Sequence, residues 1–317
     1  MEAGRSTYMS QQEPNYSLAL EALDWAVQRT DCATGEQAPP SAQPADFRAA
    51  AEQALPELRR RLDTILMANE PEAGLDALLE CGALAALLPA VAKMVGFSDG
   101  EWRHKDVWKH TKQVVRQAVP RLEVRWAALF HDIGKVKTCS ITPDGQVHFF
   151  GHAEVGVRMF DKMERRLPLF TGDESLQRAV RFLILHHLRA SQYSKDWTDS
   201  AVRRFAREMG AHLDDLICLS KADITTKRPE RKRHGLRQIS DLAERVSELA
   251  RLDAIKPPLP TGLGNAIMEA FGIPPSRLLG DIMHTLETHV KAGRLPAQAD
   301  AAVYIGYLDD NPSLLEP

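Results

Sequence analysis

Between residues 104 and 223, histidines and aspartates recur where helix-period apolar stripes turn toward a core. His110 lies three residues after Val107 and four before Val114, and such spacings share one helix face. His152 likewise precedes Val155 by three residues. Burying such groups costs several kcal/mol unless they are paired or coordinated. The pattern therefore predicts inward-facing metal ligands from separate helices, and the full candidate set is His110, His131, Asp132, His152, His186, His187 and Asp223.

Taken singly, each candidate has an ordinary structural explanation. A lone histidine on an apolar stripe is commonly a hydrogen-bonded core residue. Asp132, just before Gly134, is equally consistent with a carboxylate at a helix end, and the His186-His187 pair with a solvated helix end. Asp223 is consistent with a surface position. The set as a whole favours a metal site, because independent coincidences multiply.

Composition places the chain among water-soluble globular proteins. With 317 residues and 44% hydrophobic content, it can bury one large core or two small ones. A net charge of −3 gives no global attraction to nucleic acid. The four cysteines form no C-x-x-C pair, which indicates thiols in a reducing compartment. Without a signal-like N-terminus or an apolar run of about 18 residues, we expect a cytoplasmic protein with no membrane contact.

Apolar periodicity predicts an almost entirely α-helical chain in three parts. Residues 1–55 form an N-terminal extension with one helix and a Pro-rich linker at 38–45, which we expect not to be helical. Residues 56–255 carry the helical stripes and the candidate ligands. The one β signal is a short hairpin over 139–150, with a turn at 143–145. Residues 256–317 form a small helical region.

The order of these residues resembles the HD-domain phosphohydrolase superfamily. His110, His131-Asp132 within the string HDIGK, and Asp223 match its H…HD…D pattern, and GHAEVG and LILHHLR look like further motifs in the right order. The resemblance implies an α-helical HD bundle that binds one or two divalent metals.

A closer resemblance covers roughly residues 56–310. The strings over 102–111, 127–135 and 259–275 are similar to the C-terminal half of bacterial tRNA nucleotidyltransferases, the CCA-adding enzymes that carry an HD domain. In that family a nucleotidyltransferase head with a Gly-Gly-rich loop and a D-x-D metal pair precedes this region. Residues 1–55 contain neither and are too short for such a head, so we expect no CCA addition from this chain alone.

The resemblance also implies a ligand set. His110, His131, Asp132 and Asp223 would hold a first ion, and Asp132 would bridge to a second held by His152, His186 and His187. Paired ions about 3.5–4 Å apart can activate a bridging water for in-line attack on phosphate. Imidazole ligands favour manganese, nickel, cobalt, iron or zinc over magnesium.

Other residues are candidates for contact with the substrate. Asp132 and Lys135 are the predicted catalytic pair, although Lys135 also suits a cation at a helix end. Arg189 is placed to clamp a phosphate oxygen, and His104 matches a family position near the metals.

The strongest local charge run spans residues 227–237 and holds six lysines and arginines. Such a run is commonly a solvated surface. Its position a few residues after Asp223 also suits contact with a phosphate backbone, for which Lys227, Arg228 and Arg231 are candidates. It contains no aromatic residue, so it gives no indication of base stacking.

The candidate ligands predict a metal-dependent phosphohydrolase, and the resemblance implies phosphodiesterase or phosphatase activity toward 2′,3′-cyclic phosphates or toward nucleotides and RNA 3′-ends. No DNA specificity is expected. Two alternatives remain open, a hydrolase of small or signalling nucleotides and a non-catalytic RNA-binding subunit. Neutralising the run at 227–237 would impair an RNA enzyme but not a mononucleotide enzyme.

Overall fold

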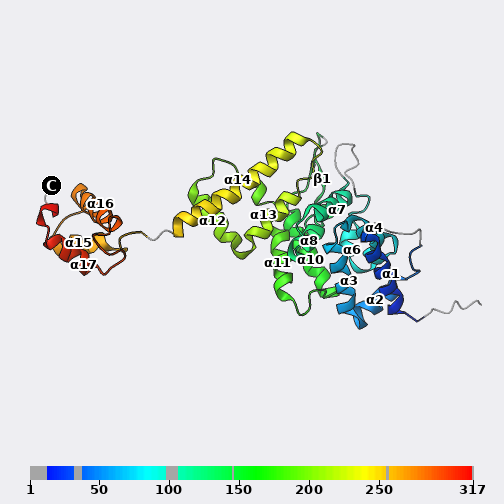
Figure 1. The fold of residues 1–317 in the computed structure, drawn as a ribbon. Helices are drawn as coiled ribbons and strands as arrows, with labels where there is room; N and C mark the ends of the chain where they lie inside the picture. Colours follow the sequence, from blue (N-terminus) through cyan, green and yellow to red (C-terminus); the bar gives the residue numbers. More distant parts are fainter. Residues whose placement is uncertain (1–12, 32–37, 98–105, 145, 255–256, 316–317) are drawn as a thin grey trace, which may run out of the picture. The chain divides into compact units, whose positions relative to one another are not determined.

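The computed structural model describes residues 13–31, 38–97, 106–144, 146–254 and 257–315. It divides into two compact units, residues 1–246 and 247–317. The predicted all-α architecture with one short hairpin is confirmed (Figure 1). Within the described ranges, none of the helices combines the length and apolar character needed to cross a bilayer. The predicted substrate contact His104 lies outside the described residues, and so does Gly145, the last residue of the predicted turn.

The first helices of unit 1 pack onto one another. They are α1 (Tyr16–Gln28), α2 (Pro44–Gln53), α3 (Leu55–Met67), α4 (Pro71–Glu80), α5 (Ala83–Leu87) and α6 (Pro89–Ala92). The predicted N-terminal helix is α1, and it buries Leu23 and Trp25 against α2, α3 and α4. The prediction that the whole linker would be non-helical was wrong at its end. Helix α2 begins at Pro44, because proline at the first helical position sacrifices no helical hydrogen bond.

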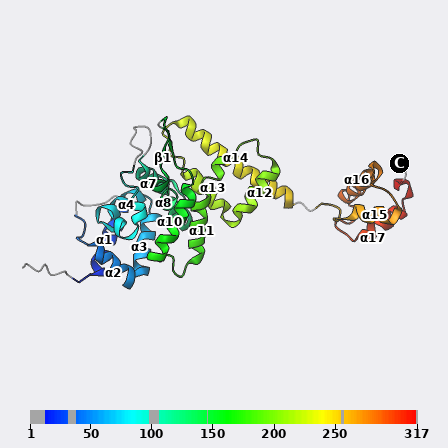
Figure 2. The ribbon, with the colours of Figure 1, turned by 180° about the vertical axis from the view of Figure 1, so that it is seen from behind.

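Helix α8 (Leu122–Phe130) is the centre of unit 1. Every side chain from Val124 to Phe130 is buried, because α8 is packed by α3, by α7 (Val107–Gln117), by α11 (Glu174–His186) and by α13 (Leu213–Ala222). Figure 2 shows α7, α8, α11 and α13 side by side from behind, as in Figure 1. Trp126 anchors α8 by stacking on Phe130, with a 5.6 Å separation of ring centroids. The C-terminal end of α8 is therefore held firmly inside the bundle.

The remaining elements of unit 1 follow α8 in the chain. They are α9 (Lys135–Thr138), the antiparallel strands β1 (Ser140–Ile141) and β2 (Val147–His148), α10 (His152–Arg166), α12 (Asp199–Met209) and α14 (Pro229–Ala254), which continues into unit 2. Helix α12 was not predicted. The full length of α14 was not predicted either, because α14 begins in a stretch of charge with few apolar residues. Once folded, α14 buries Ile239 and Leu242.

Unit 2 has its own small core. Helices α15 (Leu263–Phe271), α16 (Arg277–Lys291) and α17 (Ala301–Asp309) form it, which agrees with the predicted helical C-terminal region. Ile267, Leu286 and Leu308 are fully buried in it. Tyr304 is also buried, and its hydroxyl donates a hydrogen bond to the carbonyl of Pro296 at 2.6 Å.

Candidate metal centre

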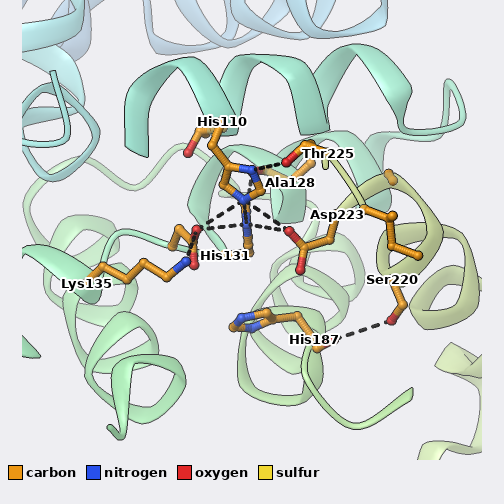
Figure 3. Close-up of polar contacts among 12 residues, drawn as sticks. His110, Ala128, His131, Lys135, His187, Ser220, Asp223 and Thr225 are labelled. Carbon is orange, nitrogen blue, oxygen red and sulfur yellow. Dashed lines mark hydrogen bonds and ion pairs between the residues drawn. The ribbon is translucent and has the colours of Figure 1, made fainter. Parts of the chain in front are cut away.

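The candidate ligands come from the ends and inner faces of five helices. His110 lies on α7, where the Asp106 side chain caps the helix by accepting the Lys109 amide at 3.1 Å. His131 and Asp132 follow α8 directly, and His152 is the first residue of α10. His187 follows α11 and Asp223 follows α13. Figure 3 shows His110, His131, His187 and Asp223 pointing toward a common centre.

Two glycines bring these elements close together. A Cβ at Gly134 would lie 2.0 Å from the carbonyl oxygen of His152 and 2.8 Å from the amide of Gly156, so only glycine fits there. Gly151 has a φ of 71°, a left-handed conformation that favours glycine, and it starts α10 at His152. The glycines of HDIGK and GHAEVG thus set the separation between Asp132 and His152.

The ligands form two groups that share Asp132. The His110 group consists of His110, His131 and Asp132, and the His152 group consists of Asp132, His152 and His187. Asp132 Oδ2 lies 3.3 Å from His110 Nε2 and 3.2 Å from His131 Nε2, whereas its Oδ1 lies 3.6 Å from His152 Nε2. One carboxylate therefore faces both groups, each through a different oxygen.

Asp223 completes the His110 group. Its Oδ1 lies 3.1 Å from His110 Nε2 and 3.5 Å from His131 Nε2. The side chain of Asp223 is 29% exposed and that of Lys135 is 22% exposed, whereas those of His131 and Asp132 are each 1% exposed. The centre is thus open on the side of Asp223 and Lys135.

The outer nitrogens of the imidazoles are fixed by the backbone. His131, His152 and His187 each direct Nδ1 at 2.8 Å to the carbonyl three residues earlier, and because a carbonyl only accepts, Nδ1 must donate. In the neutral imidazole Nε2 is then a bare lone pair. The Nε2 atoms of His152 and His187 face each other at 3.1 Å, and those of His110 and His131 at 3.3 Å. The facing lone pairs of neutral His152 and His187 repel unless a cation lies between them, so this donor pair fits a divalent metal ion.

The protonation states suit cation binding in the His152 group. Burial lowers the pKa of His187 to about 4 and also lowers the pKa of His152, so both imidazoles are neutral at pH 7. Burial opposes ionisation of Asp132, but the charge of His131 and hydrogen bonds from the imidazoles hold its pKa well below the usual range. Burial also opposes protonation of His131, but the carboxylates of Asp132 and Asp223 outweigh it and raise the pKa of His131 to about 10. In the metal-free state the carboxylates thus share a proton held by His131, where a metal would supply the positive charge.

Two further side chains support the centre. Lys135 Nζ lies 2.6 Å from Asp132 Oδ2, and it also lies over the ring of Phe149 at 5.5 Å. Thr225 Oγ1 bonds His110 Nδ1 at 2.8 Å (Figure 3). Thr225 was not among the predicted site residues, and its position two residues after Asp223 was the only signal for it in the sequence.

The other predicted site residues lie apart from these groups. His186 packs against the ring of Phe182, with a 4.3 Å separation of the ring centroids, and it belongs to neither group. Arg189 pairs with Glu208 at 2.7 Å. Lys227 and Arg228 lie on the exposed loop that follows Asp223, and Arg231 lies in the first turn of α14.

Comparison with known proteins identifies the part of the chain that carries this centre. Residues 107–254 match the model of the HD domain. The chain contains an HD domain. HD domains are a fold of metal-dependent hydrolases, and the two ligand groups lie inside the matched range.

Relatives of this HD-domain chain extend the match beyond that range. It is 28% identical over 256 residues to the A-adding tRNA nucleotidyltransferase of Deinococcus radiodurans, which covers 78% of this chain and 57% of that protein. It is 29% identical over 279 residues to the CC-adding tRNA nucleotidyltransferase of Thermus thermophilus, which covers 83% of this chain and 59% of that protein. The match thus spans less than two thirds of either relative, and the HD domain is related to those enzymes.

Proposed function

We propose that this chain is a metal-dependent phosphohydrolase that opens 2′,3′-cyclic phosphodiesters or removes terminal phosphates from nucleotides and RNA ends. The observation that carries the proposal is the position of Asp132, whose two oxygens face separate imidazole groups. A carboxylate shared in this way is the arrangement needed to bridge two cations. Paired ions supply an activated water and neutralise charge on a phosphate when bound.

The proposed ligands divide between two metal ions. His110, His131, Asp132 and Asp223 would hold one ion, and Asp132 with His152 and His187 the other. The imidazole donors suit manganese, nickel, cobalt, iron or zinc better than magnesium. We assign no ligand role to His186, because its ring faces Phe182 instead.

Lys135 is the proposed phosphate-binding residue. It stands at the open side of the centre, and its ammonium contacts Asp132 at 2.6 Å. A phosphate anion on that side would gain a charge-assisted hydrogen bond from Nζ. His131 and His187 are buried, so bulk water does not reach the centre past these two side chains.

The basic run at 227–237 is the proposed contact for an RNA backbone. It begins four residues after Asp223, and among the described residues no ion pair involves its lysines or arginines. Arginines elsewhere in unit 1, such as Arg61 and Arg121, pair with aspartates instead. Cations without an ion pair that follow a candidate ligand so closely in the chain favour a polyanion over a mononucleotide. The tRNA substrates named for the relatives are consistent with an RNA substrate.

The experiment is hydrolysis of 2′,3′-cyclic AMP and of a short RNA ending in a 2′,3′-cyclic phosphate, with manganese, nickel or cobalt added. Asp132→Ala should abolish metal-dependent turnover. Asp214→Ala is the matched control, because its side chain is 92% exposed on α13. No turnover of either substrate by the wild type, while metal is bound, would overturn the proposal.

A second set of variants tests the RNA contact. Replacing Lys227, Arg228 and Arg231 by alanine should lower kcat/KM for the RNA but not for cyclic AMP. The slope of log(kcat/KM) against log salt should become shallower by about 2, from about 0.7 for each lost phosphate contact. The control replaces three exposed cations elsewhere, Arg60, Lys195 and Arg204. Equal losses for both triple variants would count against an RNA contact at the run.

A further inference from the structure

Phe150 is an aromatic side chain left in solvent beside the metal centre. It is 79% exposed, whereas Phe130, Phe160 and Phe170 in the same unit are at most 1% exposed. It precedes the left-handed Gly151 and the ligand His152, so its Cα is at most about 7 Å from that of His152. Exposing a phenylalanine costs burial free energy, which makes the position a candidate for binding.

The ring is part of an ordered stack. The rings of Phe150 and His148 lie 4.9 Å apart between centroids and 10° from parallel. On one side, β2 holds His148 opposite Ser140 of β1. On the other side, the Phe149 carbonyl accepts the hydrogen bond from His152 Nδ1 at 2.8 Å. The pair is therefore tied both to the hairpin and to a metal ligand.

We propose that His148 and Phe150 form a stacking platform for the nucleobase of the substrate whose phosphate enters the metal centre. This inference rests on the proposed function. A nucleobase has a planar π-face that can extend a parallel stack, and every base can do so. The phosphate would lie one ribose away, toward Lys135, whose Nζ lies over the neighbouring ring of Phe149.

The chemistry of the surroundings favours a base over an apolar partner surface. Ile141 is the other exposed large apolar side chain of the hairpin, at 62% exposed. It pairs with Val147, one position away from the Ser140–His148 pair, so it points to the opposite face of the ladder from His148. The platform is thus a pair of stacked rings and not part of a continuous apolar patch.

The platform would also supply what the basic run lacks. The run at 227–237 offers charge without aromatic rings, and it would hold backbone phosphates without contacting bases. Stacking at Phe150 is sequence-tolerant, which fits recognition of a terminal nucleotide of any identity. The two features would bind different parts of one RNA end.

The first test compares a nucleotide with a substrate that has no base. Phe150→Ala should reduce the ratio of kcat/KM for 2′,3′-cyclic AMP to that for glycerol 1,2-cyclic phosphate by roughly 5- to 150-fold, the range for one base–aromatic stack. The loss should come from KM, and Phe150→Trp should restore it. Ile141→Ala is the matched control, an exposed apolar residue on the other face. An unchanged ratio in Phe150→Ala, or an equal fall in Ile141→Ala, would overturn the platform.

The second test needs no turnover. In Phe150→Trp, adenosine 3′-monophosphate should quench the added tryptophan fluorescence saturably, and glycerol phosphate should not, with the wild-type spectrum as the baseline. Equal quenching by both compounds, or none by the nucleotide, would refute stacking. Saturable quenching in Phe150→Trp, together with no hydrolysis by the wild type, would support the stacking platform and overturn the proposed hydrolytic activity. Failure of the platform can therefore be distinguished from failure of the proposed function.

Discussion

Gly134→Ala should damage both stability and metal binding, because the new methyl group would meet backbone. Its Cβ would lie 2.0 Å from the His152 carbonyl oxygen, and that gap must open to at least 3.4 Å for ordinary contact. Only a shift of α10 or of the turn that carries Asp132 can open it. Overpacking of a core typically costs about 1–3 kcal/mol, and a backbone clash belongs at the upper end. We therefore expect a loss of about 3 kcal/mol in the free energy of unfolding.

The same shift would separate the ligands of the His152 group. His152 Nε2 lies 3.6 Å from Asp132 Oδ1 and 3.1 Å from His187 Nε2, so a displacement of more than 1 Å at α10 removes it from a shared ion. Urea denaturation would measure the stability, and elemental analysis after dialysis against nickel would measure the bound metal. Both should fall in Gly134→Ala.

Gly156→Ala provides the matched control. Its Cβ would meet Ile184 Cγ2 at 3.4 Å and the Gly134 amide at 3.7 Å, which are ordinary contacts. Alanine is favoured over glycine inside a helix by about 1 kcal/mol, so this variant should be as stable as the wild type or slightly more so. If the two variants had the same stability and metal content, the close approach of Gly134 to α10 would not be what sets the centre.

Three further outcomes follow from the structure. Burial raises the pKa of Glu164 from 4.5 to about 7, so the folded state binds this proton more tightly and stability falls as pH rises from 4.5 to 7. Glu164→Gln should match the wild type at pH 4.5 and exceed it by about 3 kcal/mol at pH 8, as measured by urea denaturation, and a gain equal at both pH values would contradict this. Manganese or nickel at 100 times its dissociation constant should add about 2.7 kcal/mol to the free energy of unfolding, and a chelator should remove it in a thermal-shift assay. His187→Ala should weaken nickel binding by roughly ten-fold or more, and His186→Ala should not, as calorimetry would measure; equal effects would refute the ligand assignment.

The helical architecture was predictable because its elements bury one apolar stripe each. The stripe at Leu58, Leu62 and Ile65 became α3, and all three residues are buried. Helix α14 lacked such a signal over its first ten residues, where charge dominates. It is stabilised through contacts later in the helix, such as Leu242, and by Lys232, whose Nζ lies 3.3 Å from Gln117 Oε1. Contacts of that kind depend on tertiary structure and leave no periodic trace in the sequence.

The two histidines that end α11 show how far periodicity can resolve a metal centre. Val180, Leu183 and Ile184 are buried, and His187 follows them by seven, four and three residues, so it continues their stripe and joins the centre. His186 has only one of these spacings, three residues after Leu183; it is rotated by about 100° from His187 and packs against Phe182, one turn earlier. The doublet in the motif suggested two ligands, but one helix face can direct only one of two adjacent side chains to a given point. Where a motif and a helical stripe disagree on adjacent residues, the stripe is therefore the better guide, because it reports the direction of the side chain.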